Sequence, residues 1–500
     1  AQADYGRLLA LLYDNGYFGP TLKITLDGVD AAAIPPVQPP RRIDRAVITV
    51  DPGPKFRFGA ARIAPVAPGT ELPEGFASGE TASLGVLKET VSAGVSGWRD
   101  VGHAKAELAD QDLVAKHRER QIDAALRIAP GPKLRFGALT VTGNEDVRTA
   151  RLIEIAGLPE GEVFSPEELE LATERLRRTG AFDAVALIEA DRIGPNDTLP
   201  IAAQVTDAPK RLSAEVEGIG GNSGGEDYTL SARFERPATF NEDTDFYALA
   251  TLEQLDEVNY FSRQLDLEAG IERIANQNRT YSAGLGLRVA ETEDAFGTNQ
   301  YTLLTLPLGA EFDYRDKELD ATEGYYIDAN ITPFVALSGS ESGLRTYFDA
   351  RYYRSFGTER PVTLAFRGQL GTVAGPDLSE APADYLFYSG GGGTVRGQPY
   401  QSLGVDLASG DTVGGRSFVG LSAEARVALT EKIGVVGFAD AGYIGSEEFY
   451  DGSGTWHSGA GLGLRYATGI GPIRLDVAVP TSGPEVDEDF QVYIGIGQAF

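Results

Sequence analysis

The chain has 500 residues, of which 73 are acidic and 44 basic, and a formal net charge of −29. This length favours two or more domains. The acidic balance argues against a nucleic-acid partner, because phosphate binding needs clustered Lys and Arg. The absence of cysteine excludes disulfides, thiol catalysis and Cys–zinc sites. No apolar run approaches the ~18 residues of a transmembrane helix, which leaves a soluble protein or a membrane β-barrel.

The first two hundred residues contain an internal repeat. Pro-Gly-Pro-Lys occurs at 52–55 and again at 130–133, each time followed by x-Arg-Phe-Gly-Ala, and a weaker copy appears at 208–211. A fixed spacing of this size indicates tandem copies of one small domain. We therefore predict three small domains, at residues 1–53, 54–131 and 132–208, followed by a different domain at 209–500.

The third copy predicts a strand at 135–142, a helix that begins after Ser165 and ends before Gly180, and two further strands near 182–191 and 199–207. This order resembles the POTRA domain, a periplasmic module that binds extended chains by adding a strand to its sheet. The first copy begins directly with the helix, so its opening strand is missing. Since the chain also contains no Met, we expect the rest of this domain and a signal peptide upstream of residue 1.

The remaining residues alternate as β-strands. In 473–479 the odd-numbered side chains are apolar, whereas Arg474 and Asp476 lie on the other face. Near the end of the chain, apolar side chains occupy even-numbered positions, and only Gln498 interrupts the series. This pattern resembles the carboxy-terminal signal of outer-membrane barrels. This set comprises Phe490, Val492, Ile494, Ile496 and Phe500.

The alternative to a membrane barrel is a soluble β-sandwich, whose strands alternate too. The strands here run to about ten residues, which is long for a sandwich, and their polar faces combine charge with glycine, as expected for a wet lumen. Aromatic residues near strand ends are interpreted as a membrane girdle. They are Tyr325, Tyr326, Phe334, Tyr352, Tyr353 and Phe356.

Residues 387–404, FYSGGGGTVRGQPYQSLG, combine four glycines with a single cation. Val395, Arg396, Gly397 and Gln398 resemble the Val/Ile-Arg-Gly-Tyr/Phe motif of the BamA/TamA superfamily of POTRA-plus-barrel proteins. Residues 438–444, FADAGYI, resemble its Phe-x-Asp-x-Gly strand motif through Phe438 and Gly442.

This resemblance implies α+β POTRA repeats followed by an all-β transmembrane antiparallel barrel. The superfamily implies about sixteen strands, whereas about fourteen can be counted here. The loop at 384–416 is expected to fold back into the lumen. The alternative is that Arg396 lies on an external hairpin tip.

Strand parity predicts partners for Arg396. If Leu421 and its odd-numbered neighbours face lipid, Glu424 faces the lumen, and the same argument turns Asp440 inward. An unpaired buried guanidinium would cost several kcal/mol, so we expect both carboxylates to anchor Arg396, as the superfamily pattern also implies. Because Gln398 replaces the usual aromatic, we expect Tyr400 to take over its contact with the barrel wall.

No catalytic residue, metal site or cofactor is expected. The G-x-S-x-G pattern at 221–225 lies between two predicted strands, not in the strand-to-helix turn that a nucleophile elbow requires. Three histidines argue against a His-rich metal site. The chain is therefore not expected to be an enzyme.

The resemblance implies a location in the outer membrane of a Gram-negative bacterium, with the POTRA domains in the periplasm. It implies a factor that inserts or secretes autotransporters and other outer-membrane proteins, through POTRA strand addition and lateral barrel opening. Three POTRA copies favour the TamA branch, because BamA usually carries five and two-partner secretion pores two. The implied partners are a TamB-like inner-membrane-anchored protein, client outer-membrane proteins and the lipid bilayer.

The predicted seam of the barrel lies between residues 211–220 and 490–500. Gly218, Gly220 and Gly221 are expected to weaken strand pairing there. The alternative functions are a BamA-like general assembly factor, a passive secretion or transport pore, and an outer-membrane enzyme.

Overall fold

The computed structural model describes residues 2–34, 42–145, 147–207, 215–217, 227–357, 360–484, 486 and 489–500. The chain divides into two compact units, residues 1–210 and 211–500, and each is described by itself. Within the described ranges, no helix is both long enough and apolar enough to cross a membrane.

The first unit contains three small sheets of three strands each. Its elements are α1 (Gln2–Asp14), β1 (Thr21–Leu26), β2 (Val29–Asp30), η1 (Ala31–Ala33), β3 (Ala46–Asp51), β4 (Arg57–Ala64), α2 (Leu84–Asp100), β5 (Glu107–Lys116), β6 (Gln121–Ala129), β7 (Arg135–Thr142), α3 (Thr149–Ala156), α4 (Pro166–Arg178), β8 (Phe182–Glu189), η2 (Pro195–Asp197) and β9 (Thr198–Asp207).

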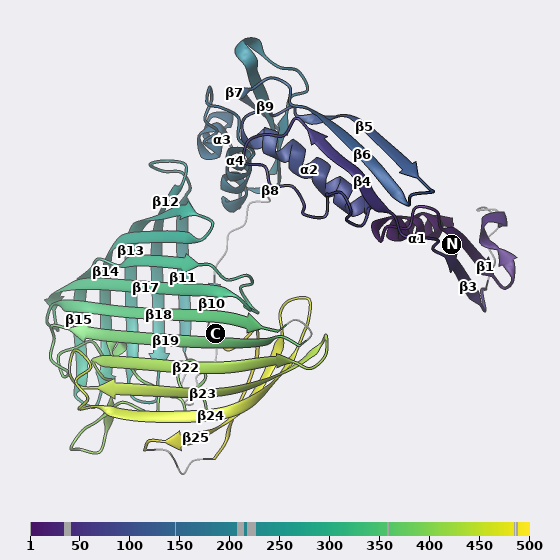
Figure 1. Ribbon diagram of the computed structural model, residues 1–500. Helices are drawn as coiled ribbons and strands as arrows, with labels where there is room; N and C mark the ends of the chain where they lie inside the picture. Colours follow the sequence, from purple (N-terminus) through teal and green to yellow (C-terminus); the bar gives the residue numbers. More distant parts are fainter. Residues whose placement is uncertain are drawn as a thin grey trace. The chain divides into compact units, whose positions relative to one another are not determined.

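Two of these sheets share one topology, with orders β4-β6-β5 and β7-β9-β8 (Figure 1). In each, the last strand is central, pairs in parallel with the first strand and pairs antiparallel with the strand before it. The N-terminal sheet has the order β2-β1-β3, and β1 is antiparallel to both of its neighbours. Among the described residues, this sheet therefore has no strand equivalent to β4 or β7.

The predicted elements of the third copy are confirmed. The Ser165 hydroxyl accepts a hydrogen bond from the backbone N–H of Glu168, which caps α4 at its N-terminus, and Pro166 occupies the first turn. In the two Pro-Gly-Pro-Lys turns, Gly53 and Gly131 have φ of 65° and 67°, a conformation that favours glycine. Each turn leads from the last strand of one sheet to the first strand of the next. The third, weaker copy at 208–211 lies outside the described residues.

The second unit is one antiparallel sheet in which almost every strand pairs with its neighbours along the chain. Its strands are β10 (Glu215–Glu217), β11 (Tyr228–Arg236), β12 (Thr244–Asp256), β13 (Phe261–Asn276), β14 (Arg279–Asp294), β15 (Gly297–Thr305), β16 (Leu308–Asp313), β17 (Gly324–Ser338), β18 (Gly343–Phe356), β19 (Val362–Ala374), β22 (Ser417–Ala428), β23 (Ile433–Gly445), β24 (Thr455–Tyr466), β25 (Ile473–Ser482) and β26 (Gln491–Ile496).

These fifteen strands occupy fourteen positions, because β15 and β16 both lie between β14 and β17. Pro307, which has no N–H to donate, separates these two strands, while its carbonyl still accepts a hydrogen bond from Gly284 at 2.9 Å. The part of the chain that the structure describes thus gives the fourteen positions counted from the sequence. The sixteen implied by the resemblance are not reached there.

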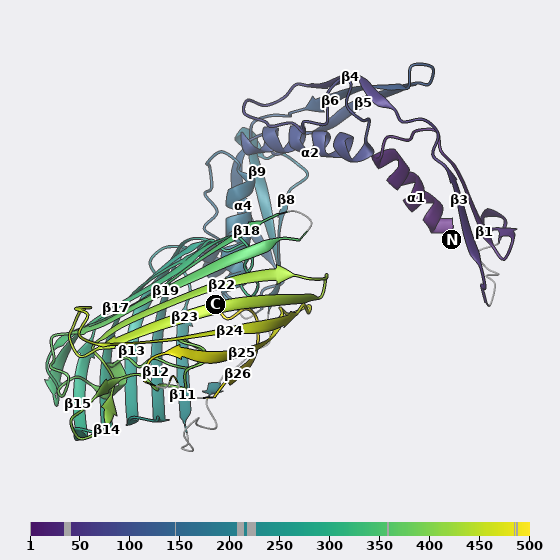
Figure 2. The ribbon, with the colours of Figure 1, turned by 60° about the horizontal axis from the view of Figure 1, so that its bottom comes forward.

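The sheet is strongly curved (Figure 2), and its side chains alternate between an apolar outer face and a polar inner face. In β22, Leu421 is 50% exposed whereas Glu424 is 3% exposed. In β25, Val477 is exposed and Asp476 is fully buried. An outward apolar band and an inward polar face are the pattern of a membrane barrel.

The predicted aromatic girdle is only half correct. Tyr325, Tyr352 and Phe356 are exposed on the outer face, but the other three side chains turn inward. Phe334 and Tyr353 are buried, and the hydroxyl of Tyr326 donates to Glu311 at 3.1 Å. The prediction considered closeness to strand ends and ignored parity, and parity decides which side a residue faces.

Residues 375–416 connect β19 to β22, and we call this segment the lumen loop. It contains η3 (Ala383–Tyr385) and a hairpin of β20 (Val405–Asp406) and β21 (Thr412–Val413). Several of its side chains are buried together with inward residues of the strands. The loop therefore fills part of the barrel interior.

The last residues of the chain lie beyond the end of the last strand. β26 ends at Ile496, and Gly497 has a φ of 87°, which turns the last residues away from the strand direction. Phe500 is buried against Ala321, Tyr353 and Ala365. Phe500 therefore does not continue the outward face of Ile494, because the alternation of a strand does not extend beyond its end.

Candidate functional site

Arg396, which follows the four glycines 390–393, is buried and lies among carboxylates from the barrel wall. Its Nε and Nη2 donate to the two oxygens of Asp440 at 2.7 and 2.9 Å, and its Nη1 donates to Glu424 at 2.6 Å. The backbone N–H of Arg396 also donates to Asp440, at 3.1 Å. This paired, charge-assisted geometry is among the strongest that arginine makes. The ring of Phe438 lies beneath the guanidinium, 3.6 Å from Cζ to the ring centroid.

A third carboxylate, that of Asp476, completes this cluster. It lies 3.5 Å from Nη1 of Arg396 and also accepts a hydrogen bond from Arg465. Glu424 in turn accepts from Arg426 at 2.8 Å. Each of the three buried carboxylates thus has at least one guanidinium partner, as a buried charge network requires.

Glycines let the lumen loop approach the wall. A Cβ at Gly459 would meet the backbone oxygen of Arg396, and one at Gly442 would meet the side chains of Ser389, Val395 and His457. On the loop side, Gly397 has a φ of 96°, and a Cβ there would lie 2.6 Å from the backbone oxygen of Val479. The glycines of the inward faces of β23 and β24 thus leave the space that the loop fills.

Gln398 is itself the wall contact, and the prediction that Tyr400 would replace it is wrong. Gln398 is fully buried, and its Nε2 donates to the carbonyls of Ser458 and Ser482 at 2.7 and 3.0 Å. Tyr400 is 41% exposed and donates from its hydroxyl to Glu257, in the turn between β12 and β13, at 3.2 Å. An amide can hydrogen-bond to strand carbonyls, which the aromatic residue of the motif could not do with its ring.

The lumen loop also touches the last strand. The hydroxyl of Tyr493, in β26, accepts a hydrogen bond from the backbone N–H of Gly397 at 3.0 Å. Elsewhere in the site, Ser389 and His457 form a buried hydrogen bond of 2.7 Å. The sequence pattern alone did not predict this contact, because Ser389 and His457 are 68 residues apart.

The remaining predicted residues lie apart from this cluster. Phe490, Val492, Ile494 and Ile496, which share one parity, are exposed. The seam glycines Gly218, Gly220 and Gly221 lie outside the described residues, and so does the 221–225 pattern. Within the described part of the chain, no group of three or more His, Asp or Glu side chains is placed to hold a metal ion.

Comparison with known proteins agrees with this architecture. Residues 213–500 match the Omp85 superfamily domain, and residues 134–206 match the POTRA repeat, described as a surface antigen variable number repeat. The chain belongs to the Omp85 superfamily. As an Omp85 protein with a POTRA repeat, it resides in the outer membrane of a Gram-negative bacterium, with its POTRA region in the periplasm.

Among curated proteins, the chain is similar to the outer membrane protein assembly factor BamA of Neisseria meningitidis serogroup B. The two are 23% identical over 514 residues, which cover 84% of this chain and 62% of that relative. The chain thus spans less than two thirds of the relative's length.

Among solved structures, it is similar to BamA from Haemophilus ducreyi lacking POTRA domains 1–3. The TM-score is 0.64 and the identity 16%, with 87% of this chain and 99% of that chain covered. This likeness concerns the fold.

Proposed function

We propose that this Omp85 protein is an assembly factor of the TamA type, which helps to insert or secrete autotransporters and other outer-membrane proteins. The three sheets of residues 1–210 act as three POTRA domains, with boundaries near 53, 131 and 208. They bind extended client segments and a TamB-like inner-membrane-anchored partner. The barrel then accepts client strands at its seam.

Strand addition by the POTRA region is supported by the free edge of β5. In its sheet, β5 pairs only with β6 among the described residues, and its side chains are exposed along almost the whole strand. An exposed edge presents unpaired N–H and C=O groups to a partner chain. A client or partner segment in extended conformation can therefore extend this sheet.

The observation that carries lateral opening is the short last strand. β26 pairs with β25 only from Ile473 to Ala478, although β25 continues to Ser482. On its other side, β26 has no partner among the described residues. A short strand with one free edge is held by few hydrogen bonds, so few need to break for the sheet to open there.

A second candidate is a BamA-like general barrel assembly factor, which the name of the curated relative from Neisseria meningitidis favours. Depletion of this chain distinguishes the two. If the chain is a TamA-type factor, its depletion should reduce the surface display of autotransporters and leave porin levels unchanged. If it is a general assembly factor, its depletion should reduce both. Residues 1–210 used as bait should also retain a TamB-like protein only in the first case.

Cysteine crosslinking in this Cys-free chain tests the seam. Pairs placed between 211–220 and 490–500 should crosslink and block client assembly until they are reduced. The matched control is a pair at Ala423 and Ala439, which are register partners on the adjacent strands β22 and β23 and should leave assembly unchanged. If the seam-crosslinked barrel assembles autotransporters at the normal rate, lateral opening is not the mechanism.

A further inference from the structure

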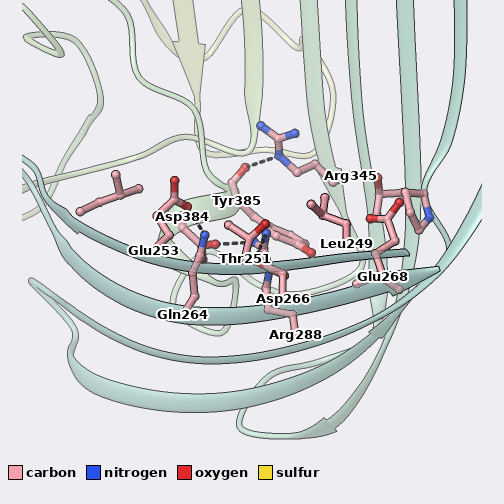
Figure 3. A pocket seen from close by; sticks show the side chains of 14 residues that line it. Leu249, Thr251, Glu253, Gln264, Asp266, Glu268, Arg288, Arg345, Asp384 and Tyr385 are labelled. Carbon is pink, nitrogen blue, oxygen red and sulfur yellow. Dashed lines mark hydrogen bonds and ion pairs between the residues drawn. The ribbon is translucent and has the colours of Figure 1, made fainter. Parts of the chain in front are cut away.

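The lumen loop contains a second buried charge of opposite sign to Arg396. Asp384 lies in η3, and only 4% of its side chain is exposed. Its carboxylate accepts a hydrogen bond from Nη1 of Arg288 at 2.6 Å (Figure 3). Its other oxygen accepts a hydrogen bond from the hydroxyl of Tyr301, a residue that is 1% exposed.

On the barrel wall, Asp384 shares its cationic partner, Arg288, with a second carboxylate. Arg288, in β14, also donates to both oxygens of Asp266, in β13, at 2.7 and 3.2 Å. Tyr301 approaches from β15. The wall cation therefore keeps one carboxylate partner even without Asp384, so the contact to the loop can be removed without leaving Arg288 unpaired.

The next residue of the loop strengthens this contact. The ring of Tyr385 faces the guanidinium groups of Arg288 and Arg345, with its centroid 4.9 and 5.8 Å from the two Cζ atoms. Arg345 also donates from Nε to the backbone oxygen of Tyr385 at 3.1 Å (Figure 3). Phe334 packs edge-on against the same ring at 5.3 Å. Cation–π and aromatic contacts of this kind hold a ring in one orientation.

The two charged contacts lie on different parts of the wall. Arg396 pairs with residues of β22, β23 and β25, whereas Asp384 and Tyr385 contact β14, β15, β17 and β18. Because the loop charges are opposite in sign, neither contact can accept the partners of the other. The loop is thereby stretched across the interior in one register.

A polar cavity of about 450 Å³ borders the Asp384 contact. Figure 3 shows that side chains of the strands and of the loop face it together. It is lined by Glu253, Asp266 and Glu268 from the wall as well as by Asp384, against the two cations Arg288 and Arg345. A loop that moved away from Arg288 would add its own volume to this water-accessible space.

We propose that Asp384 is a second anchor of the lumen loop and that this anchor keeps the barrel interior closed to ions. The cation Arg396 binds the loop to carboxylates of β22 and β23, and the anion Asp384 binds it to Arg288 of β14. Releasing Asp384 removes the charged contact of the loop with β14 and its hydrogen bond to β15, and an ion pathway opens along the polar cavity. This property concerns permeability and is separate from client assembly.

The experiment measures single-channel conductance of the full chain in planar lipid bilayers. Asp384→Asn, which keeps the side-chain size and removes the charge, should raise the mean conductance several-fold. Tyr301→Phe, which removes one hydroxyl and keeps the ring, should raise it less. The matched control is Asp411→Asn, which removes the same charge from an exposed position of the same loop and should leave conductance unchanged.

The proposal is overturned if folded Asp384→Asn and Tyr301→Phe proteins both conduct like Asp411→Asn. If Asp384→Asn does not fold, the result with Tyr301→Phe decides alone.

Discussion

Arg426 donates a hydrogen bond from Nη2 to the backbone oxygen of Phe500 at 3.0 Å. The same guanidinium donates from Nε to Glu424, whose other carboxylate oxygen accepts from Arg396 at 2.6 Å. One carboxylate therefore connects the lumen loop to the C-terminal tail. A second connection runs from Asp476 through Arg465 to the side chain of Gln498.

This connection predicts that Phe500→Ala weakens the barrel. The substitution removes a buried ring packed against Tyr353 and below Arg426, and losses of this type cost about 3–5 kcal/mol. Unfolding by urea in lipid vesicles measures the effect. The control Ile494→Ala, at an outward position that is 76% exposed, should cost much less, and equal losses would contradict the inward placement of Phe500.

Arg396→Ala should destabilise the barrel and loosen the lumen loop, because it leaves buried carboxylates without their shared partner. Removing one member of a buried ion pair costs about 3–5 kcal/mol. A double-mutant cycle with Asp440→Asn tests the contact itself, since residues in direct contact deviate from additivity by about 0.5–3 kcal/mol. Additive effects on the free energy of unfolding would mean that the loop is held in another way.

The glycine contacts predict a position-dependent effect of adding one methyl group. Gly459→Ala places a Cβ against the backbone oxygen of Arg396, which cannot move without displacing the loop, and overpacking of this type costs about 1–3 kcal/mol. The control is Gly393→Ala in the lumen loop, where an added Cβ would meet nothing within 4 Å. Protease cleavage of the lumen loop should therefore accelerate in the first variant only, and similar cleavage in both would contradict the close approach.

Local spacing was sufficient to predict much of this architecture. The cap at Ser165 depends on residues three positions apart, and the inward direction of Glu424 and Asp440 depends only on strand parity. Both features can be read from a short window of sequence. The fourteen strand positions of the described residues follow from the same alternation.

Other features depend on contacts between distant segments. Asp476 was recognised as inward, but its approach to Arg396 depends on the register of β23, β24 and β25, which no single strand encodes. The burial of Phe500 depends on the turn at Gly497. Asp384 has no motif around it, and its partner Arg288 lies 96 residues away in the sequence.

The contact between Tyr400 and Glu257 makes the turn between β12 and β13 sensitive to pH. Burial raises the pKa of Glu257 above its ordinary value of 4.5, the hydrogen bond from Tyr400 opposes this shift, and the nearby Asp227 and Asp256 add to it. A carboxyl group whose pKa is raised by folding stabilises the folded state below its ordinary pKa. This contribution is lost as the pH rises through the folded-state pKa.

Glu257→Gln should therefore be more stable than the wild-type chain at neutral pH and equally stable at a pH well below 4.5, where Glu257 is protonated in both states. Urea unfolding across this pH range measures the difference. Tyr400→Phe removes the hydrogen bond that favours the ionised form, so the loss of stability should extend to higher pH than in the wild-type chain. If the free energies of unfolding of wild type and Glu257→Gln differ by the same amount at every pH, the charge of Glu257 does not cause the difference. Only a titrating carboxylate can make this difference grow as the pH rises.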